Sequence, residues 1–388
     1  MTARTRAAVA YAAMFTAVGA HAPYLVVYYR QLGLDIAAIG ATVSIAALVG
    51  FSAAPAWGWL SDRFDGSPRV FLLATVTAAT GSILLSAALF DVPVVVGAAL
   101  LAVGMAGMAP ILDARALERA GAERHGFGPL RAWGSAGYIA SSFLTGVGIL
   151  AFGMGALFAV LTTAIVVTGV VGVTLVPHDT SESPPPRGAI RALFGRRGLG
   201  GFLGAAFVTW IALAAIMAFY PLRLTELGAP APVVGLASAL GAAVEVPLML
   251  RFPALLKRFG AERLVVAGAA MFALRALVAG LTGDPAVLVA ASAIGGVGYA
   301  LFLVGGVTHV SLRAPTQLAA TAQGAFQGTV SLGQVAAASL GGIVAGGLGI
   351  EGLFLVCAAL AGVAVWLVAV TVGSSSRARV AEPVVADS

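Results

Sequence analysis

The chain has 388 residues, of which 60% are hydrophobic and only 10% are charged, and its mean hydropathy is +1.00. A soluble domain is about 25% charged, so this composition excludes both a soluble enzyme and a disordered chain. The net charge of +6 is spread over short loops without a basic stripe, which argues against a nucleic-acid partner and leaves a polytopic membrane protein.

Apolar segments of about 20 residues, long enough to cross a bilayer, recur along the chain. Twelve spans are predicted, near residues 7–29, 37–61, 69–89, 94–117, 130–153, 155–176, 199–222, 232–256, 264–282, 286–311, 318–346 and 351–372. The polar segment 177–198 separates the first six from the last six. We therefore expect an all-α membrane protein with six-helix bundles at 1–176 and 199–373, a cytoplasmic linker between them, and a polar cytoplasmic tail at 374–388.

The basic residues are distributed unequally between the two sides of these spans. If the N-terminus lies inside, Arg30 and Arg223 face outside and Arg275 lies within a span, so the remaining 19 of the 22 Lys and Arg residues are cytoplasmic. Cytoplasmic loops of membrane proteins carry this excess. The pattern predicts a multi-pass protein of the cell (inner) membrane with both termini in the cytoplasm.

The two halves carry an internal repeat. At an offset of 195 residues, Gly33 falls on Gly228 and Gly40 falls on Gly235, and the neighbouring leucines match as well. A common offset at both ends of this loop indicates that the halves are copies of one six-span unit. Parallel repeats of this kind are found in secondary transporters.

The segment 58–69, GWLSDRFDGSPR, follows the second predicted span. It resembles the G-x-x-x-D-R-x-G-R-R signature of the major facilitator superfamily, although Asp65 interrupts the pattern. The resemblance implies a conformational-switch motif formed by Gly58, Asp62 and Arg63, in which the Asp braces neighbouring helix ends in the outward-open state. The alternative is a solvated charged turn.

The segment 112–146, LDARALERAGAERHGFGPLRAWGSAGYIASSFLTG, is similar to the phenylpropionate permease and oligosaccharide:proton symporter branches of that superfamily. A weaker similarity to lactose permease implies roles for single residues. Asp113 and Arg131 would bind substrate, Tyr138 would stack on a sugar, and Arg275 would be the arginine of span nine.

The chain also departs from that permease. Gly295 and Gly298 stand where the permease has a His-x-x-Glu motif in span ten. The complete proton relay of that permease is therefore not expected in this chain. Glu245 lies near the centre of span eight, where a charge is costly and is therefore a functional candidate. A buried carboxyl is suited to bind and release a proton, and Arg275 is its expected counter-charge; the alternative is a permanent structural ion pair.

The hairpin between spans four and five places two charges at one level. Asp113 and Arg131 are each nine residues from Ala122, the centre of the inside loop, so they should lie at equal depth on adjacent helices. That permits a charge-assisted pair. The alternative is that Asp113 pairs with Arg115 or Arg119 and only fastens the cytoplasmic end.

Two histidines and two tyrosines complete the ionisable candidates. His21, Tyr24 and Tyr28 lie at helical spacing in span one and could contact substrate, and His309, near the inner end of span ten, could take part in proton coupling. The alternative for each is a packed, hydrogen-bonded residue.

Span eleven carries a row of amides. Gln323, Gln327 and Gln334 lie at i, i+4 and i+11, on one face of the predicted helix. They are candidate substrate ligands; otherwise they join helix to helix.

No P-loop and no Cys/His cluster occurs in the sequence, so ATP hydrolysis, a metal site and a cofactor are not expected, and we expect no enzyme. The expected function is secondary active transport of a small organic solute by alternating access. Proton-coupled symport is favoured, with an aromatic acid, a sugar or a nucleoside-like substrate, and with the proton and the lipid bilayer as the other partners of a monomer. The alternatives are a proton-antiport exporter and a non-transporting membrane sensor or scaffold.

Overall fold

The computed structural model describes residues 3–64, 68–88, 91–120, 127–175, 199–314 and 318–381, and every regular element in these ranges is a helix. The helices in chain order are α1 (Ala3–His21), α2 (Leu25–Gln31), α3 (Ile36–Arg63), α4 (Pro68–Ser86), α5 (Asp91–Ala120), α6 (Phe127–Phe152), α7 (Gly155–Gly172), α9 (Leu199–Glu226), α10 (Ala231–Leu281), α11 (Pro285–Arg313) and α12 (Ala319–Ala381).

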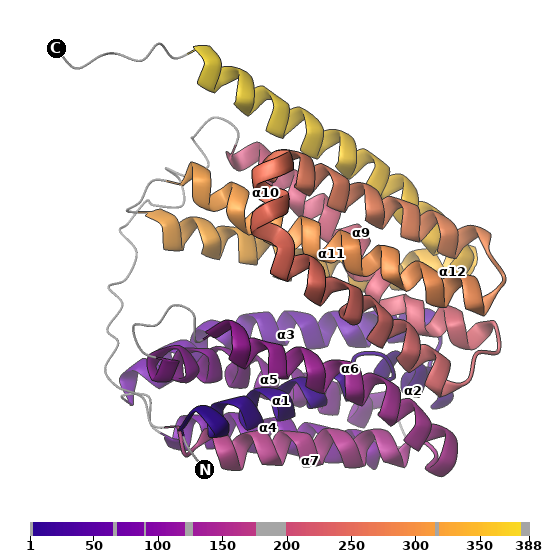
Figure 1. Ribbon diagram of the computed structural model, residues 1–388. Helices are drawn as coiled ribbons and strands as arrows, with labels where there is room; N and C mark the ends of the chain where they lie inside the picture. Colours follow the sequence, from indigo (N-terminus) through magenta and orange to yellow (C-terminus); the bar gives the residue numbers. More distant parts are fainter. Residues whose placement is uncertain are drawn as a thin grey trace.

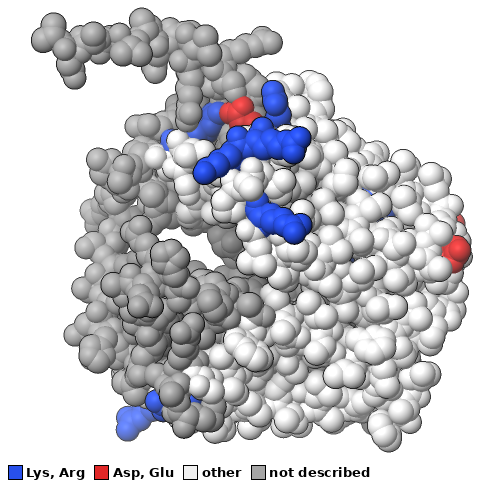
Figure 2. Space-filling view, in the orientation of Figure 1, with Lys and Arg blue, Asp and Glu red and all other residues white. Residues whose placement is uncertain are grey.

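Ten segments of the described chain are long and apolar enough to cross a membrane. Helices satisfy all of their backbone hydrogen bonds internally, which hydrocarbon requires of any spanning segment. The charged side chains visible in Figure 2 gather toward the end where the chain begins and ends and at the opposite tip, with a broad uncharged surface between them. The protein is therefore a multi-pass membrane protein.

Two predicted boundaries can be compared directly with the structure. The predicted turn between the fifth and sixth spans is confirmed, since α6 ends at Phe152 and α7 begins at Gly155. The predicted first span, 7–29, lies within the candidate membrane segment Thr5–Gln31, although the chain leaves the helix after His21 and re-enters it at Leu25. Pro23 lies in this break, and proline both lacks an N–H donor and disfavours a helical residue before it.

Two other predicted turns lie inside long helices. Gly260 in α10 has φ 77° and ψ 155°, and Gly349 in α12 has φ 74° and ψ 171°. Glycine alone adopts this backbone conformation readily. Each of these helices therefore consists of two helical segments joined at a glycine kink.

The internal repeat is visible in the backbone hydrogen bonds. Gly33 has φ 91° and Gly228 has φ 80°. The residues that follow them, Leu34 and Ala229, donate to carbonyls five residues back, over 3.2 Å and 3.0 Å. The two helix ends are thus closed in the same way, 195 residues apart, as the sequence alignment of the halves predicts.

The helices form two sets, seen below and above in Figure 1. We call α1 to α7 the N-terminal set and α9 to α12 the C-terminal set. One core, which includes the fully buried Phe71, runs through the N-terminal set and continues into the C-terminal set. A second core, which includes Phe272 and Phe302, lies within the C-terminal set. The sets meet where α3 packs against α12 and α6 packs against α10. These contacts lie at the end of the molecule away from the two termini, which we call the closed end.

Glycines allow the sets to approach closely there. A Cβ atom on Gly40 of α3 would lie 2.6 Å from Cα of Gly342 in α12, and one on Gly146 of α6 would lie 2.6 Å from the carbonyl oxygen of Ala231 at the start of α10. A Cβ on Gly235 would overlap the backbone of Ser142. Gly40 and Gly235 are repeat equivalents, so both crossings use the same position of the repeated unit.

Replacing Gly235 with leucine should force the closed end apart, because the new side chain would overlap the backbone of α6. We expect spin labels at Gln31→Cys and Gly347→Cys, in a Cys357→Ala background, to move to longer distances in a pulsed electron paramagnetic resonance measurement. Gly204→Leu is the control, since a Cβ there meets no atom within 4 Å. An unchanged distance distribution in Gly235→Leu would contradict the tight crossing.

Candidate functional site

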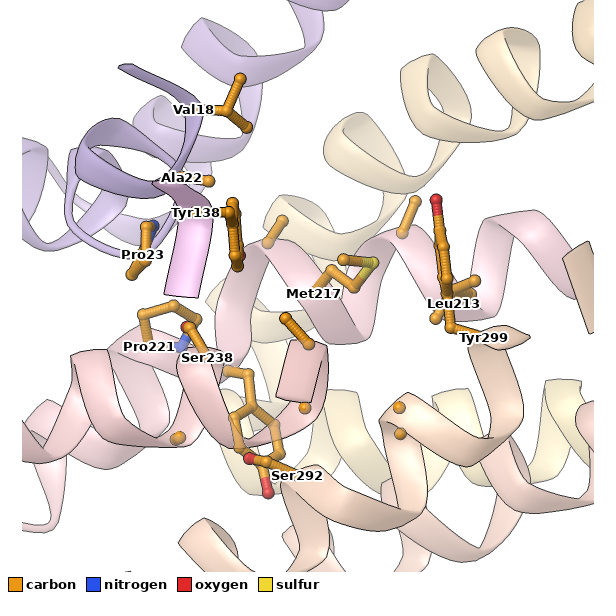
Figure 3. Close-up of a pocket in the computed structure, with 18 of the residues that line it drawn as sticks. Val18, Ala22, Pro23, Tyr138, Leu213, Met217, Pro221, Ser238, Ser292 and Tyr299 are labelled. Atoms are coloured by element: carbon orange, nitrogen blue, oxygen red, sulfur yellow. The ribbon is translucent and has the colours of Figure 1, made fainter. Parts of the chain in front are cut away.

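A cavity of about 780 Å³ lies between the two sets of helices. Its wall is drawn from α1, α3 and α6 on one side and from α9, α10, α11 and α12 on the other. Figure 3 shows Tyr138 of α6 facing the same space as Met217 of α9 and Tyr299 of α11. A chamber of this size, mostly apolar with a few polar groups, is typical of small-molecule sites.

Two residues of opposite charge line this cavity. Glu245 and Arg275 both lie on α10, before and after its kink, so the fold of that helix brings them to one chamber. Tyr138, which belongs to the N-terminal set, lines the same chamber. Among the described residues, no ion pair within 4.0 Å joins Glu245 to Arg275, so their expected relation as counter-charges stays a prediction.

The guanidinium of Arg275 lies over an aromatic ring. Its guanidinium carbon is 4.1 Å from the centre of the Tyr220 ring. Tyr220 is held in turn by a hydrogen bond of 2.6 Å from its hydroxyl to the carbonyl oxygen of Leu288 on α11. The cation–π contact stabilises the guanidinium at this position.

Of the other predicted binding residues, some line the cavity and some do not. His21 lines the cavity, and its Nδ1 lies 2.8 Å from the carbonyl oxygen of Ala17. Gln334 also lines it, whereas Gln323 and Gln327 are not among the lining residues. Gln323 instead donates to the Val307 carbonyl oxygen and to the Ser311 hydroxyl, at 2.9 Å and 2.7 Å, and so joins α12 to α11.

Tyr24, Tyr28 and His309 are placed away from the cavity wall. The Tyr24 hydroxyl donates to the carbonyl oxygen of Ser142 and lies 3.2 Å from that of Ala231, so it joins the two sets at the closed end. Tyr28 donates to the Leu85 carbonyl oxygen within the N-terminal set. His309 is 2% exposed, and its ring packs 4.4 Å from that of Phe202, centre to centre.

Three predicted residues have side chains outside the described part of the structure. Asp113 and Arg131 lie on α5 and α6, and Asp62 lies on the last turn of α3, but only their backbone is described. In the same motif Gly58 is exposed, and the Arg63 guanidinium lies 5.7 Å from the Trp59 ring centre.

Sequence reasoning missed most of the aromatic and hydroxyl groups of the wall. Trp210, Tyr220, Ser238, Ser292 and Tyr299 all line the cavity. On α9 and α10 they belong to stripes with helical spacing, which sequence can detect. Nothing in such a stripe distinguishes a cavity wall from a lipid-facing or helix-packing surface. Within the described chain, no group of three or more His, Cys, Asp and Glu residues is placed to hold a metal ion.

The two tyrosines of the first span allow a matched test of the closed end. Each single Tyr→Phe change removes a hydroxyl that donates to a backbone carbonyl, and should cost about 1 kcal/mol of stability against thermal unfolding. Only Tyr24→Phe should also shift the closed-end distance distribution toward open forms, because only Tyr24 reaches the other set. Equal effects of Tyr24→Phe and Tyr28→Phe on that distribution would refute the assignment.

Comparison with known proteins identifies the wider group. Residues 5–356 match the sequence profile of the MFS_1 like family. The maltose permease of Geobacillus stearothermophilus is 28% identical over 268 residues, which are 68% of each chain. Among solved structures, the nucleoside transporter NupG superposes with a TM-score of 0.84 at 17% identity, covering 96% of this chain and 99% of that one. The POT family transporter PepTSo superposes with a TM-score of 0.76 at 14% identity, covering 96% of this chain and 98% of that one.

The profile match spans nearly the whole chain, and the two structures share its fold. The cavity between two helix sets, lined by charged and aromatic side chains, is the feature that such a transporter needs. The chain belongs to the MFS_1 like family and is a secondary transporter of the major facilitator superfamily.

Proposed function

We propose that this transporter takes up a small organic solute together with protons, by alternating access to the cavity. The single observation that carries the proposal is the chamber between the two helix sets, with Glu245 and Arg275 in its wall. A carboxyl group in such a chamber can exchange a proton with water as the chamber changes sides. The relatives named above carry maltose and nucleosides, so a sugar and a nucleoside stand beside an aromatic acid as substrate classes.

Twelve spans are proposed, in two halves. A helix rises 1.5 Å per residue, so each 51-residue candidate segment in α10 and α12 would extend about 76 Å, more than twice the thickness of the hydrocarbon core. The kinks at Gly260 and Gly349 therefore separate two spans in each. The halves comprise residues 1–176 and 199–373, joined by the linker 177–198 and followed by the tail 374–388.

The termini are proposed to lie in the cytoplasm, and the closed end outside. The excess of Lys and Arg in alternate loops supports this orientation. It makes the present conformation inward-facing, with the outer crossings of α3 with α12 and of α6 with α10 shut. Gly58, Asp62 and Arg63 would then form the inner switch that braces the opposite, outward-facing state.

The substrate site is proposed to combine Arg275, Tyr138 and His21 with Asp113 and Arg131, and the chain to act as a monomer. Tyr138 supports this grouping, because it lies on α6, seven residues after Arg131, and lines the same cavity as Arg275 and His21. Residues seven apart face the same side of a helix. Asp113 is placed at the depth of Arg131 because each lies nine residues from Ala122, the centre of the loop between their helices.

Proteoliposomes containing the purified protein test the direction of coupling. A symporter should accumulate radiolabelled solute, tested with an aromatic acid, maltose and uridine, when the lumen is more alkaline than the medium, and accumulation should stop when an ionophore removes the gradient. Extrusion driven by the gradient would establish antiport instead, and the absence of flux with every solute would refute transport through the cavity.

Glu245→Gln should separate proton coupling from solute movement. The amide keeps the size and hydrogen-bonding capacity of the side chain but cannot carry the proton, so gradient-driven uptake should fall about 100-fold or more while solute exchange across the membrane continues. Asp284→Asn is the matched control, because Asp284 caps α11 outside the cavity and asparagine caps equally well. If the Glu245→Gln variant still accumulates solute fully when driven by the gradient, Glu245 has no role in proton coupling.

A further inference from the structure

Arg275 differs from Arg223 and Arg313 of the C-terminal set, which both form ion pairs. The Nη2 atom of Arg223 lies 2.7 Å from Oε1 of Glu351, and that of Arg313 lies 2.7 Å from Oε1 of Glu262. No carboxylate of the described residues lies within 4.0 Å of Arg275, whereas its Nε, like that of Arg223, is buried without a hydrogen-bond partner there. Because a charge inside a membrane protein is stabilised by an opposite charge, this guanidinium on the cavity wall has the capacity to take an anion.

The neighbouring helix leaves room for the guanidinium. A Cβ atom on Gly295 of α11 would lie 2.8 Å from Cδ and 2.9 Å from Cζ of Arg275, and would overlap its Nη1. Any residue larger than glycine would therefore displace the group. The guanidinium also contacts the Tyr220 ring, whose centre lies 4.1 Å from its carbon. Arg275 is thus packed against both a glycine and an aromatic ring, on the wall of the cavity.

A guanidinium held in this way is a specific receptor for one kind of group. Its planar N–H donors match the two oxygens of a carboxylate, whereas a sugar hydroxyl offers neither the charge nor the paired geometry. The wall around it is aromatic, with Tyr138, Trp210 and Tyr299 lining the same space. These rings suit an apolar or ring-shaped solute body.

We propose that Arg275 binds the carboxylate of the transported solute, and that the substrate is therefore a small organic anion with an apolar or ring-shaped body. Gly295 and Tyr220 are positioning residues for this subsite. The inference rests on the proposed function and narrows it, since it selects the acid from among the acid, sugar and nucleoside classes.

Binding of matched acids and neutral analogues to the purified full chain tests the proposal. The pairs are 3-phenylpropionate with 3-phenylpropionamide, and glucuronate with glucose; maltose and uridine complete the set. Quenching of tryptophan fluorescence reports binding, because Trp210 lines the cavity. At least one acid should bind about 10- to 100-fold more tightly than its neutral partner, which is the effect of hydrogen bonds to a charged group. Equal affinities within both pairs would overturn the proposal.

Substitutions test whether the preference for acids depends on Arg275. Arg275→Gln should abolish the preference for the acid, and Arg275→Lys should restore only part of it, because lysine keeps the charge but not the planar donors. Gly295→Ala should weaken acid binding while retaining the charge. Arg263→Gln, an exposed arginine on the same helix, and Gly204→Ala are the controls. Retention of the acid preference in folded Arg275→Gln protein would also overturn the proposal.

Failure here is distinguishable from failure of transport itself. If maltose or uridine is accumulated in proteoliposomes while no acid is preferred in binding, the protein is a transporter and the carboxylate subsite is wrong. If no solute moves, the proposed function fails whatever the binding data show.

Discussion

An ionised side chain in the hydrocarbon core must meet a counter-charge, a polar chamber or water. The chain uses different solutions in different places. Arg223 and Arg313, near helix ends, are paired with acids at 2.7 Å. Arg275, in the interior, faces a cavity of about 780 Å³ that Glu245 also lines. The arrangement of the two helix sets depends on this constraint, because a chamber that accommodates charge can form only where the sets are held apart.

At the closed end the two sets are held together by two helix crossings, each made at a glycine. Gly40 and Gly235, at equivalent positions of the repeat, each bring a helix against the backbone of the opposite set. The equivalence is not complete. Tyr24 donates hydrogen bonds across the α6–α10 crossing, whereas its repeat equivalent, Phe219, has no hydroxyl, and at the other crossing Ser44 bonds to Ser339 and Val335. A contact made of glycines and few hydrogen bonds can be broken at modest cost, as alternating access requires.

Much of this fold is predictable from the sequence. The length of the apolar segments predicts which parts of the chain cross the membrane. The repeat at an offset of 195 residues predicts that the helix ends at Gly33 and Gly228 are alike, which their backbone angles confirm. The break at Pro23 was missed, because a short interruption leaves the average hydropathy of the span high.

The site was predictable in part. Charges within spans identified Glu245 and Arg275, since their energetic cost does not depend on knowing the neighbours. The roles of Tyr24 and Gln323 could not be read from spacing, because a polar group on an apolar helix can face a cavity or a neighbouring helix. The packing of Gly295 and Tyr220 against Arg275 depends on contacts between residues on three different helices, which no local pattern reveals.

The central claim is that the chamber between the two sets is a hydrated solute compartment. The most direct test is the rate at which a water-soluble maleimide alkylates single cysteines in lipid nanodiscs, with Ser238→Cys in the cavity wall and Gly204→Cys as an exposed site elsewhere, both in a Cys357→Ala background. The account predicts faster alkylation at position 238 and protection by a solute that proteoliposomes accumulate. Equal rates at the two positions, unaffected by that solute, would contradict it.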